Sequence, residues 1–209
     1  MACDRAGMPP DGLRRGRSMT VLILGLVLFL GLHSVRVFAD DWRASVRTRI
    51  GAGPWKGLYS LLSLLGFALV VWGYGLARQA PVLLYTPPLW TRHLAALLTL
   101  PAFVLIVAAY VPGNAIRARL RHPMTLGIKL WAFAHLLANG TLADVLLFGG
   151  FLLWAILVFR AARRRDALAG ASPLASTPAR TLLAVLIGAL AWAAFAFWGH
   201  AALIGMRPL

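Results

Sequence analysis

The sequence predicts an all-α protein that spans a membrane with about six transmembrane helices in one bundle. Hydrophobic residues make up 60% of its 209 residues, whereas soluble globular chains contain about 45 to 50%. Charged residues fall to 13%, and the mean hydropathy is +0.77. A soluble domain of this size could not bury so much apolar surface, so we expect lipid to cover it.

Six apolar segments account for the predicted helices. At about 1.5 Å per residue, each is close to the length that crosses a hydrocarbon core roughly 30 Å thick. The segments are residues 20–38, 58–77, 94–110, 124–138, 142–159 and 182–204. The fourth is the shortest and contains Lys129, which makes it the weakest candidate. Asn139 and Gly140 are typical helix-ending residues, and they predict a tight hairpin between the fourth and fifth segments.

The chain is strongly basic, with 21 Lys and Arg residues against 6 acidic residues and a net charge of +15. Basic chains often bind nucleic acid. Here, however, most basic residues flank apolar segments, where they contact anionic lipid headgroups. We therefore expect membrane lipids as partners and no nucleic acid. Because Arg and Lys concentrate in cytoplasmic loops, loops 1, 3 and 5 are predicted to be cytoplasmic.

The predicted organisation is a single transmembrane domain over residues 19–209. The arginines before Met19 conflict with the predicted orientation, because they would lie on the outer face. A start at Met19, directly before the first apolar segment, removes this conflict. We therefore interpret residues 1–18 as a poorly ordered N-terminal extension that results from a mis-called start.

Five histidines are the side chains that can both bind a metal and transfer protons near neutral pH. They are His33, His93, His122, His135 and His200. His33 and His135 lie inside predicted spans, where ionisable residues are candidate functional residues. An equally weighted alternative for both is a structural hydrogen bond to a neighbouring helix. The other three lie near the predicted membrane interfaces, where a packing role is favoured.

The predicted orientation places His33 and His135 at depths that differ by roughly 10 Å. Two axial ligands on opposite faces of one haem, lying nearly in the membrane plane, tolerate this offset. His122 competes as the partner of His33, because both lie at the cytoplasmic level. Asn139 follows His135 by one helical turn and is suited to orient its imidazole. The predicted metal ligands are therefore His33 and His135, and His122 and Asn139 are further cofactor-binding candidates.

Four stretches of the chain carry a family resemblance. They are LGLVLFLGLHSVR from Leu24, WKGLYSLLSLLGFALVVWGYG from Trp55, RHPMTLGIKLWAFAHLLANG from Arg121 and DVLLFGGFLLWA from Asp144. In this order they resemble the NnrU family of bacterial membrane proteins, and the third stretch is the most specific. The resemblance implies a link to nitric oxide and nitrite metabolism in denitrifying bacteria. It also implies a place in the bacterial inner membrane, with respiratory or denitrification membrane proteins as partners.

The same family is similar to zeta-carotene isomerase, a membrane enzyme with a b-type haem. This similarity implies that His33, in the motif HSVR, and His135, after Trp131, are the axial ligands of haem b. The isomerase has a cysteine where this chain has Ala132. An exchange of thiolate for imidazole at the iron is therefore not implied here, although ligation by two histidines is.

These observations favour a haem-binding membrane protein linked to nitric oxide and nitrite metabolism. One alternative is a haem-dependent membrane isomerase of the zeta-carotene isomerase type, which Ala132 disfavours. Another is a non-catalytic membrane factor that assists the assembly of respiratory complexes. A transporter is the least favoured, because the sequence contains no evident inverted repeat. The sequence leaves open whether the protein is an enzyme.

Overall fold

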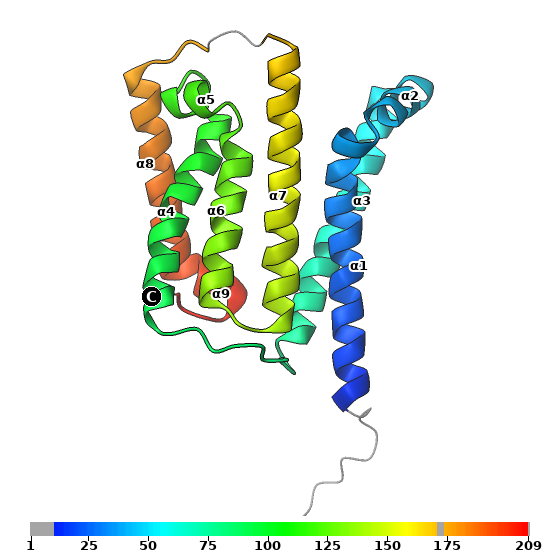
Figure 1. Ribbon diagram of the computed structural model, residues 1–209, viewed down its shortest axis with the longest axis vertical. Coiled ribbons are helices and arrows are strands. Elements are labelled where there is room, and N and C mark those ends of the chain that lie inside the picture. Colours follow the sequence, from blue (N-terminus) through cyan, green and yellow to red (C-terminus); the bar gives the residue numbers. More distant parts are fainter. Residues whose placement is uncertain (1–10, 171–173, 209) are drawn as a thin grey trace, which may run out of the picture. The chain divides into compact units, whose positions relative to one another are not determined.

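The computed structural model describes residues 11–170 and 174–208, and in these residues the secondary structure is helical apart from turns and one isolated bridge between Leu83 and Thr141. The helices are α1 (Asp11–Phe38), α2 (Asp40–Ile50), α3 (Ala52–Ala77), α4 (Trp90–Tyr110), α5 (Ala115–Leu120), α6 (Pro123–Ala138), α7 (Leu142–Leu168), α8 (Pro178–Ala194), the π-helical turn η1 (Phe195–Gly199) and α9 (His200–Ile204). Figure 1 shows their course. The all-α prediction is confirmed.

Five helical segments of the described chain are long and apolar enough to cross a membrane. They are Arg15–Phe38, Ala52–Ala77, Trp90–Tyr110, Leu142–Leu168 and Pro178–Ile204. The remaining predicted span, the fourth, corresponds to α6, which has 16 residues and is therefore about 24 Å long. That length falls short of a hydrocarbon core roughly 30 Å thick. The prediction of about six spans is close to the five helices of the described chain that are long and apolar enough to cross a membrane.

Large apolar side chains cover the outside of these helices. Leu24 on α1 is 57% exposed, Leu61 on α3 is 66% exposed and Leu190 on α8 is 69% exposed. Patches of this kind are costly in water, whereas lipid chains accept them without penalty. Together with the length of the helices, this surface identifies an integral membrane protein.

The chain divides into two compact units, which are described separately. The first extends to Leu84 and includes Thr141–Leu147. Within it, α1 packs along α3, and α2 connects them at one end (Figure 1). Glycines let the two backbones approach closely, as is typical of membrane helices. A Cβ atom at Gly73 would lie 2.4 Å from the backbone nitrogen of Leu22, and one at Gly25 would lie 2.6 Å from that of Val70.

The second unit comprises Tyr85–Gly140 and the chain from Phe148 onward. In it, α4 packs against both α6 and α8. Small residues again form the contacts, because a Cβ atom at Gly188 on α8 would lie 2.6 Å from the Cα atom of Val104 on α4. The indole nitrogen of Trp192 also donates a hydrogen bond to the Thr99 hydroxyl at 3.1 Å. A polar bond of this kind strengthens an otherwise apolar helix contact.

The predicted hairpin between the fourth and fifth apolar segments is present, with Asn139 as the C-cap of α6. Gly140 is required at this turn, because a Cβ atom there would lie 1.9 Å from the carbonyl oxygen of Tyr85. The N-terminal prediction falls partly on residues 1–10, which lie outside the described residues. Helix α1 already begins at Asp11, before Met19. The single domain over residues 19–209 and the start at Met19 stay predictions.

Candidate functional site

His33 lies on α1, five residues before its C-terminal end at Phe38. Its Nδ1 atom lies 2.7 Å from the carbonyl oxygen of Phe29, one turn earlier on the same helix. Two aromatic rings flank the imidazole. The ring centroid of Phe29 is 4.3 Å away, and that of Tyr59 on α3 is 5.5 Å away with its plane at 63°. The side chain is half-buried, and these contacts fix its orientation.

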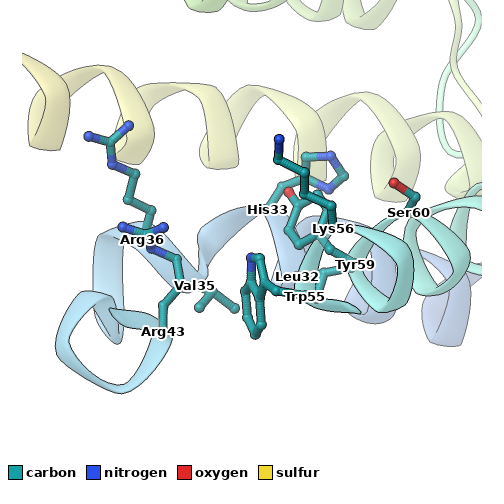
Figure 2. Close-up of a pocket in the computed structure, with 9 residues that line it drawn as sticks. All are labelled: Leu32, His33, Val35, Arg36, Arg43, Trp55, Lys56, Tyr59 and Ser60. Carbon is teal, nitrogen blue, oxygen red and sulfur yellow. The ribbon is translucent and has the colours of Figure 1, made fainter. Parts of the chain in front are cut away.

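A pocket of about 350 Å³ opens beside His33 within the first unit. It is lined by Leu32, His33, Val35 and Arg36 of α1, Arg43 of α2, and Trp55, Lys56, Tyr59 and Ser60 of α3. Figure 2 shows these side chains, with His33, Lys56 and Tyr59 close together. The pocket therefore combines an imidazole, aromatic rings and several cations at one end of the α1–α3 pair.

His135 lies on α6 in the second unit, and its contacts resemble those of His33. Its Nδ1 atom lies 2.8 Å from the carbonyl oxygen of Trp131, again one turn earlier on the helix. Its ring stacks on Phe148 of α7 at a centroid distance of 4.6 Å and an angle of 30°. The Trp131 ring lies 5.0 Å away and also contacts Phe148 and Phe151. This aromatic layer between α6 and α7 holds the half-buried imidazole in place.

Both imidazoles have the same tautomer for the same reason. A main-chain carbonyl oxygen can only accept a hydrogen bond. The Nδ1 atoms of His33 and His135 must therefore carry the proton and donate it to Phe29 and Trp131, respectively. In the neutral form of each ring, the lone pair then lies on Nε2. An imidazole oriented through Nδ1–H in this way is the usual form of a histidine that binds a metal through Nε2.

His122, the third cofactor-binding candidate, forms a hydrogen bond with a carboxylate. Its Nε2 atom lies 3.0 Å from the Oδ2 atom of Asp166 on α7, and both side chains are about one quarter exposed. The edge of its ring meets Phe159, over which the Lys129 ammonium also lies at 3.8 Å. Asp166 was not predicted as a partner of His122, because the two residues are far apart in the chain. A cofactor role for His122 stays a prediction.

Asn139 lies beside His135, as its spacing predicts, but its amide contacts the backbone. The Nδ2 atom donates a hydrogen bond to the carbonyl oxygen of His135 at 2.9 Å. The hydroxyl of Tyr85 donates to the carbonyl oxygens of Leu136 and Asn139. These bonds satisfy carbonyl groups that the end of α6 would otherwise leave without partners. Asn139 therefore stabilises the helix end that carries His135, and its role toward a cofactor stays a prediction.

The buried carboxylate of Asp144 resembles a functional group, but in the structure it caps the start of α7. Its Oδ2 atom accepts hydrogen bonds from the backbone nitrogen of Thr141 at 2.9 Å and from the Thr141 hydroxyl at 2.6 Å. The Thr141 hydroxyl in turn accepts from the backbone nitrogen of Asp144 at 3.2 Å. This reciprocal arrangement is a capping box, and the spacing of Thr141 and Asp144 indicates it in the sequence.

The two remaining histidines lie outside the predicted site. His93, in the first turn of α4, is exposed. His200 follows the π-helical turn η1, and its Nδ1 atom lies 2.7 Å from the carbonyl oxygen of Met206. Its ring meets Phe195 edge-on at 5.7 Å. His200 thereby ties the end of the described chain back to the last helix.

A haem and a bare metal ion need different sets of protein ligands. In the part of the chain that the structure describes, no three His, Cys, Asp or Glu side chains gather as a ligand set for a metal ion. A haem iron receives its equatorial ligands from the porphyrin and takes only axial ligands from the protein. Separate, oriented imidazoles such as His33 and His135 are the donors that such an iron uses.

Comparison with known proteins identifies a family. The family model described as "NnrU protein" matches residues 21–208. This range includes both oriented histidines and every helix beyond the start of α1. No curated protein and no solved structure matches the chain.

Proposed function

The chain belongs to the NnrU family, and from this premise we propose that it is a membrane protein that binds a b-type haem through His33 and His135. One observation supports the proposal most directly. Each of these imidazoles donates its Nδ1 proton to the carbonyl oxygen one turn earlier, so each carries its lone pair on Nε2. An axial ligand needs this tautomer, held by a second hydrogen bond.

The surrounding residues have distinct roles in this proposal. The carbonyl groups of Phe29 and Trp131 hold the protons at Nδ1 and increase the basicity of the opposite nitrogen. Tyr59 and Phe148 pack against the imidazole rings and hold their orientation. A bound haem would supply electron transfer and the binding of small gaseous ligands, and the apolar surroundings would influence its potential.

We further propose that the protein acts in nitric oxide or nitrite metabolism in a bacterial inner membrane, with respiratory or denitrification membrane proteins as partners. Haem iron binds nitric oxide when an axial position is open or exchangeable. Family membership and the oriented imidazoles both favour this assignment. An isomerase that exchanges a cysteine ligand is not proposed, because Ala132 occupies the corresponding position and is fully buried.

The test is a reduced-minus-oxidised absorption spectrum of the full-length protein, purified in detergent after expression with sufficient haem. The wild-type protein should show the bands of a low-spin b-type haem. His33→Ala and His135→Ala should each weaken or abolish these bands, whereas the exposed His93→Ala, a matched control, should retain them. A folded, colourless wild-type protein contradicts haem binding.

The cellular role needs a separate measurement. In a bacterium that carries the gene and respires nitrite, replacement of both His33 and His135 by alanine should change the steady-state level of nitric oxide, while His93→Ala should not. Normal nitric oxide levels in the double variant would favour the alternative of a non-catalytic assembly factor. The spectrum and the cellular measurement therefore test the cofactor and the pathway independently.

A further inference from the structure

The pocket beside His33 has a strong positive charge. Arg36, Arg43 and Lys56 reach it from three different helices. Asp40 is the acid that pairs here, and Arg43 contacts its Oδ1 atom at 2.7 Å through both Nε and Nη2. The Asp40 side chain is 47% exposed, so this pair is weak. Arg36 and Lys56 are exposed and leave an excess of positive charge at the pocket.

Neutral hydrogen-bond donors lie among these cations. Trp55, Tyr59 and Ser60 line the same pocket and supply an indole N–H and two hydroxyl groups. The Trp55 ring meets Tyr59 at 6.3 Å and Trp42 of α2 at 6.1 Å. Trp and Tyr gather at this level of a membrane protein because their rings fit the boundary between headgroups and hydrocarbon. The donors and charges suit an oxyanion with several acceptor oxygens, such as a phosphate.

An exposed apolar row continues from the pocket along α3. Lys56 and Ser60 are four residues apart, and Leu64, Phe67 and Val71 continue the same helical face at intervals of three and four residues. Leu64 is 66% exposed, Phe67 is 52% exposed and Val71 is 55% exposed. A headgroup in the pocket would therefore have its acyl chains beside these side chains. This continuity favours a lipid over a free ion.

Helix α2 adds the features of a helix that lies in a membrane surface. Trp42, Val46 and Ile50 follow each other at intervals of four residues and form an apolar stripe, with no residue of α2 buried. Arg43 and Arg47 lie on the neighbouring face of the helix. Amphipathic helices of this kind bind at the interface of anionic bilayers. Helix α2 lies at the end of the α1–α3 pair, where the pocket opens (Figures 1 and 2).

We propose that the pocket formed by Arg36, Arg43, Lys56 and Ser60 is a specific binding site for the phosphate headgroup of an anionic phospholipid. The acyl chains of this lipid lie along Leu64, Phe67 and Val71. Basic pockets between transmembrane helices bind such headgroups on the cytoplasmic side of membranes, which is the side predicted for this loop. The site goes beyond the proposed haem function and does not depend on it.

Native mass spectrometry of the full-length protein in detergent tests this proposal. Phosphatidylglycerol and phosphatidylcholine with identical acyl chains are titrated separately, and the dissociation constant of the first bound lipid is measured. Phosphatidylglycerol should bind about fivefold more tightly or better. Arg36→Gln with Lys56→Gln should weaken its binding about tenfold. The control, Arg163→Gln with Arg164→Gln, removes the same charge from exposed positions on α7 and should change it less than about twofold.

Several results would overturn the site. Equal binding of the two lipids by the wild-type protein does so without any variant. If the control variant loses the same affinity for phosphatidylglycerol, the overall positive charge of the protein attracts the lipid, and not this pocket. Inorganic phosphate that displaces phosphatidylglycerol at equal concentration would identify a free anion as the ligand. If the double glutamine variant does not fold, Lys56→Gln alone removes one of the pocket charges and should weaken phosphatidylglycerol binding, and unchanged binding by this folded variant contradicts the proposed site.

Discussion

The Tyr74 hydroxyl on α3 donates a 2.7 Å hydrogen bond to the Oδ1 atom of Asp144 at the start of α7. Asp144 is only 5% exposed, and its other carboxylate oxygen closes the capping box with Thr141. One carboxylate therefore caps a helix and bonds to a second helix in the first unit. A buried carboxyl group of this kind needs hydrogen-bond partners to offset the loss of its hydration.

Replacement of Tyr74 by phenylalanine should destabilise the protein. The change keeps the ring but removes the hydroxyl, and the buried carboxylate loses one donor. We expect a loss of about 1–3 kcal/mol in the free energy of unfolding, measured by titration with a denaturing detergent. Tyr110→Phe is the matched control, because Tyr110 is 71% exposed and should tolerate the change. Equal stability of the two variants would show that the Tyr74 bond contributes little.

Two glycines on α3 should respond in opposite ways to alanine. A Cβ atom at Gly73 would meet the backbone of α1, with Leu22 N at 2.4 Å, whereas no atom lies within 4 Å of one at Gly75. Gly73→Ala should therefore cost about 1–3 kcal/mol or more through overpacking. Gly75→Ala should be neutral or stabilising by up to about 1 kcal/mol, because alanine favours the helix. Thermal melting of both purified variants checks the prediction, and a Gly73→Ala protein as stable as wild type would contradict this close contact.

Asn114 should be more sensitive than any exposed polar residue near it. Its side chain is 1% exposed. Its Nδ2 atom donates to the carbonyl oxygens of Ala108 and Val111, and its Oδ1 atom accepts from the backbone nitrogen of Arg117. Asn114→Ala leaves buried carbonyl groups without a donor and removes the N-cap of α5, so we expect a loss of about 2–4 kcal/mol.

The control for this change is Arg119→Ala on the adjacent short helix, where the side chain is exposed. It should shift stability by less than about 0.5 kcal/mol. Detergent-induced unfolding followed by tryptophan fluorescence measures both variants. If Asn114→Ala unfolds at the same detergent fraction as Arg119→Ala, the buried hydrogen bonds of Asn114 do not stabilise the fold.

His122→Ala should leave the haem spectrum intact, in contrast to His33→Ala. The Nε2 atom of His122 contacts Asp166, so this nitrogen is already engaged by a carboxylate. Both side chains are partly exposed, and loss of the pair should cost less than about 1 kcal/mol. The absorption spectrum and the melting temperature of one preparation provide both readouts. Loss of the haem bands with an unchanged melting temperature would instead assign an axial role to His122.

The ends of the apolar helices are readable in the sequence because polar or helix-breaking residues follow them. Helices α1, α3, α4 and α6 end at Phe38, Ala77, Tyr110 and Ala138, as predicted. Their starts were less accurate, since α3 and α4 extend into flanking residues that are not strongly apolar. Hydropathy detects where a helix enters lipid, but the helix itself continues into the interface.

The short helices α2 and α5 were not predicted, because they depend on side-chain contacts that a hydropathy pattern does not show. Helix α2 is 11 residues long and mostly polar, and Trp42 packs on Trp55 of α3. Helix α5 begins at the Asn114 cap, which is itself held by carbonyl groups of α4. The tautomers of His33 and His135 depend on the rotamer that turns Nδ1 toward the carbonyl group one turn earlier, and the sequence does not determine that rotamer. The pairing of His122 with Asp166 required the packing of α6 and α7.

Helix α7 fixes how deeply the protein sits in its bilayer. It is one unbroken helix of 27 residues, and its composition changes from apolar to basic between Phe159 and Arg160. A rigid helix with such a boundary cannot shift along the membrane normal without a cost in free energy. A displacement of one turn, about 5.4 Å, would draw guanidinium groups toward hydrocarbon, where charged side chains are costly. A displacement in the opposite direction would expose leucine and phenylalanine to water. The boundary in α7 therefore determines which residues of the helix lie at the membrane surface.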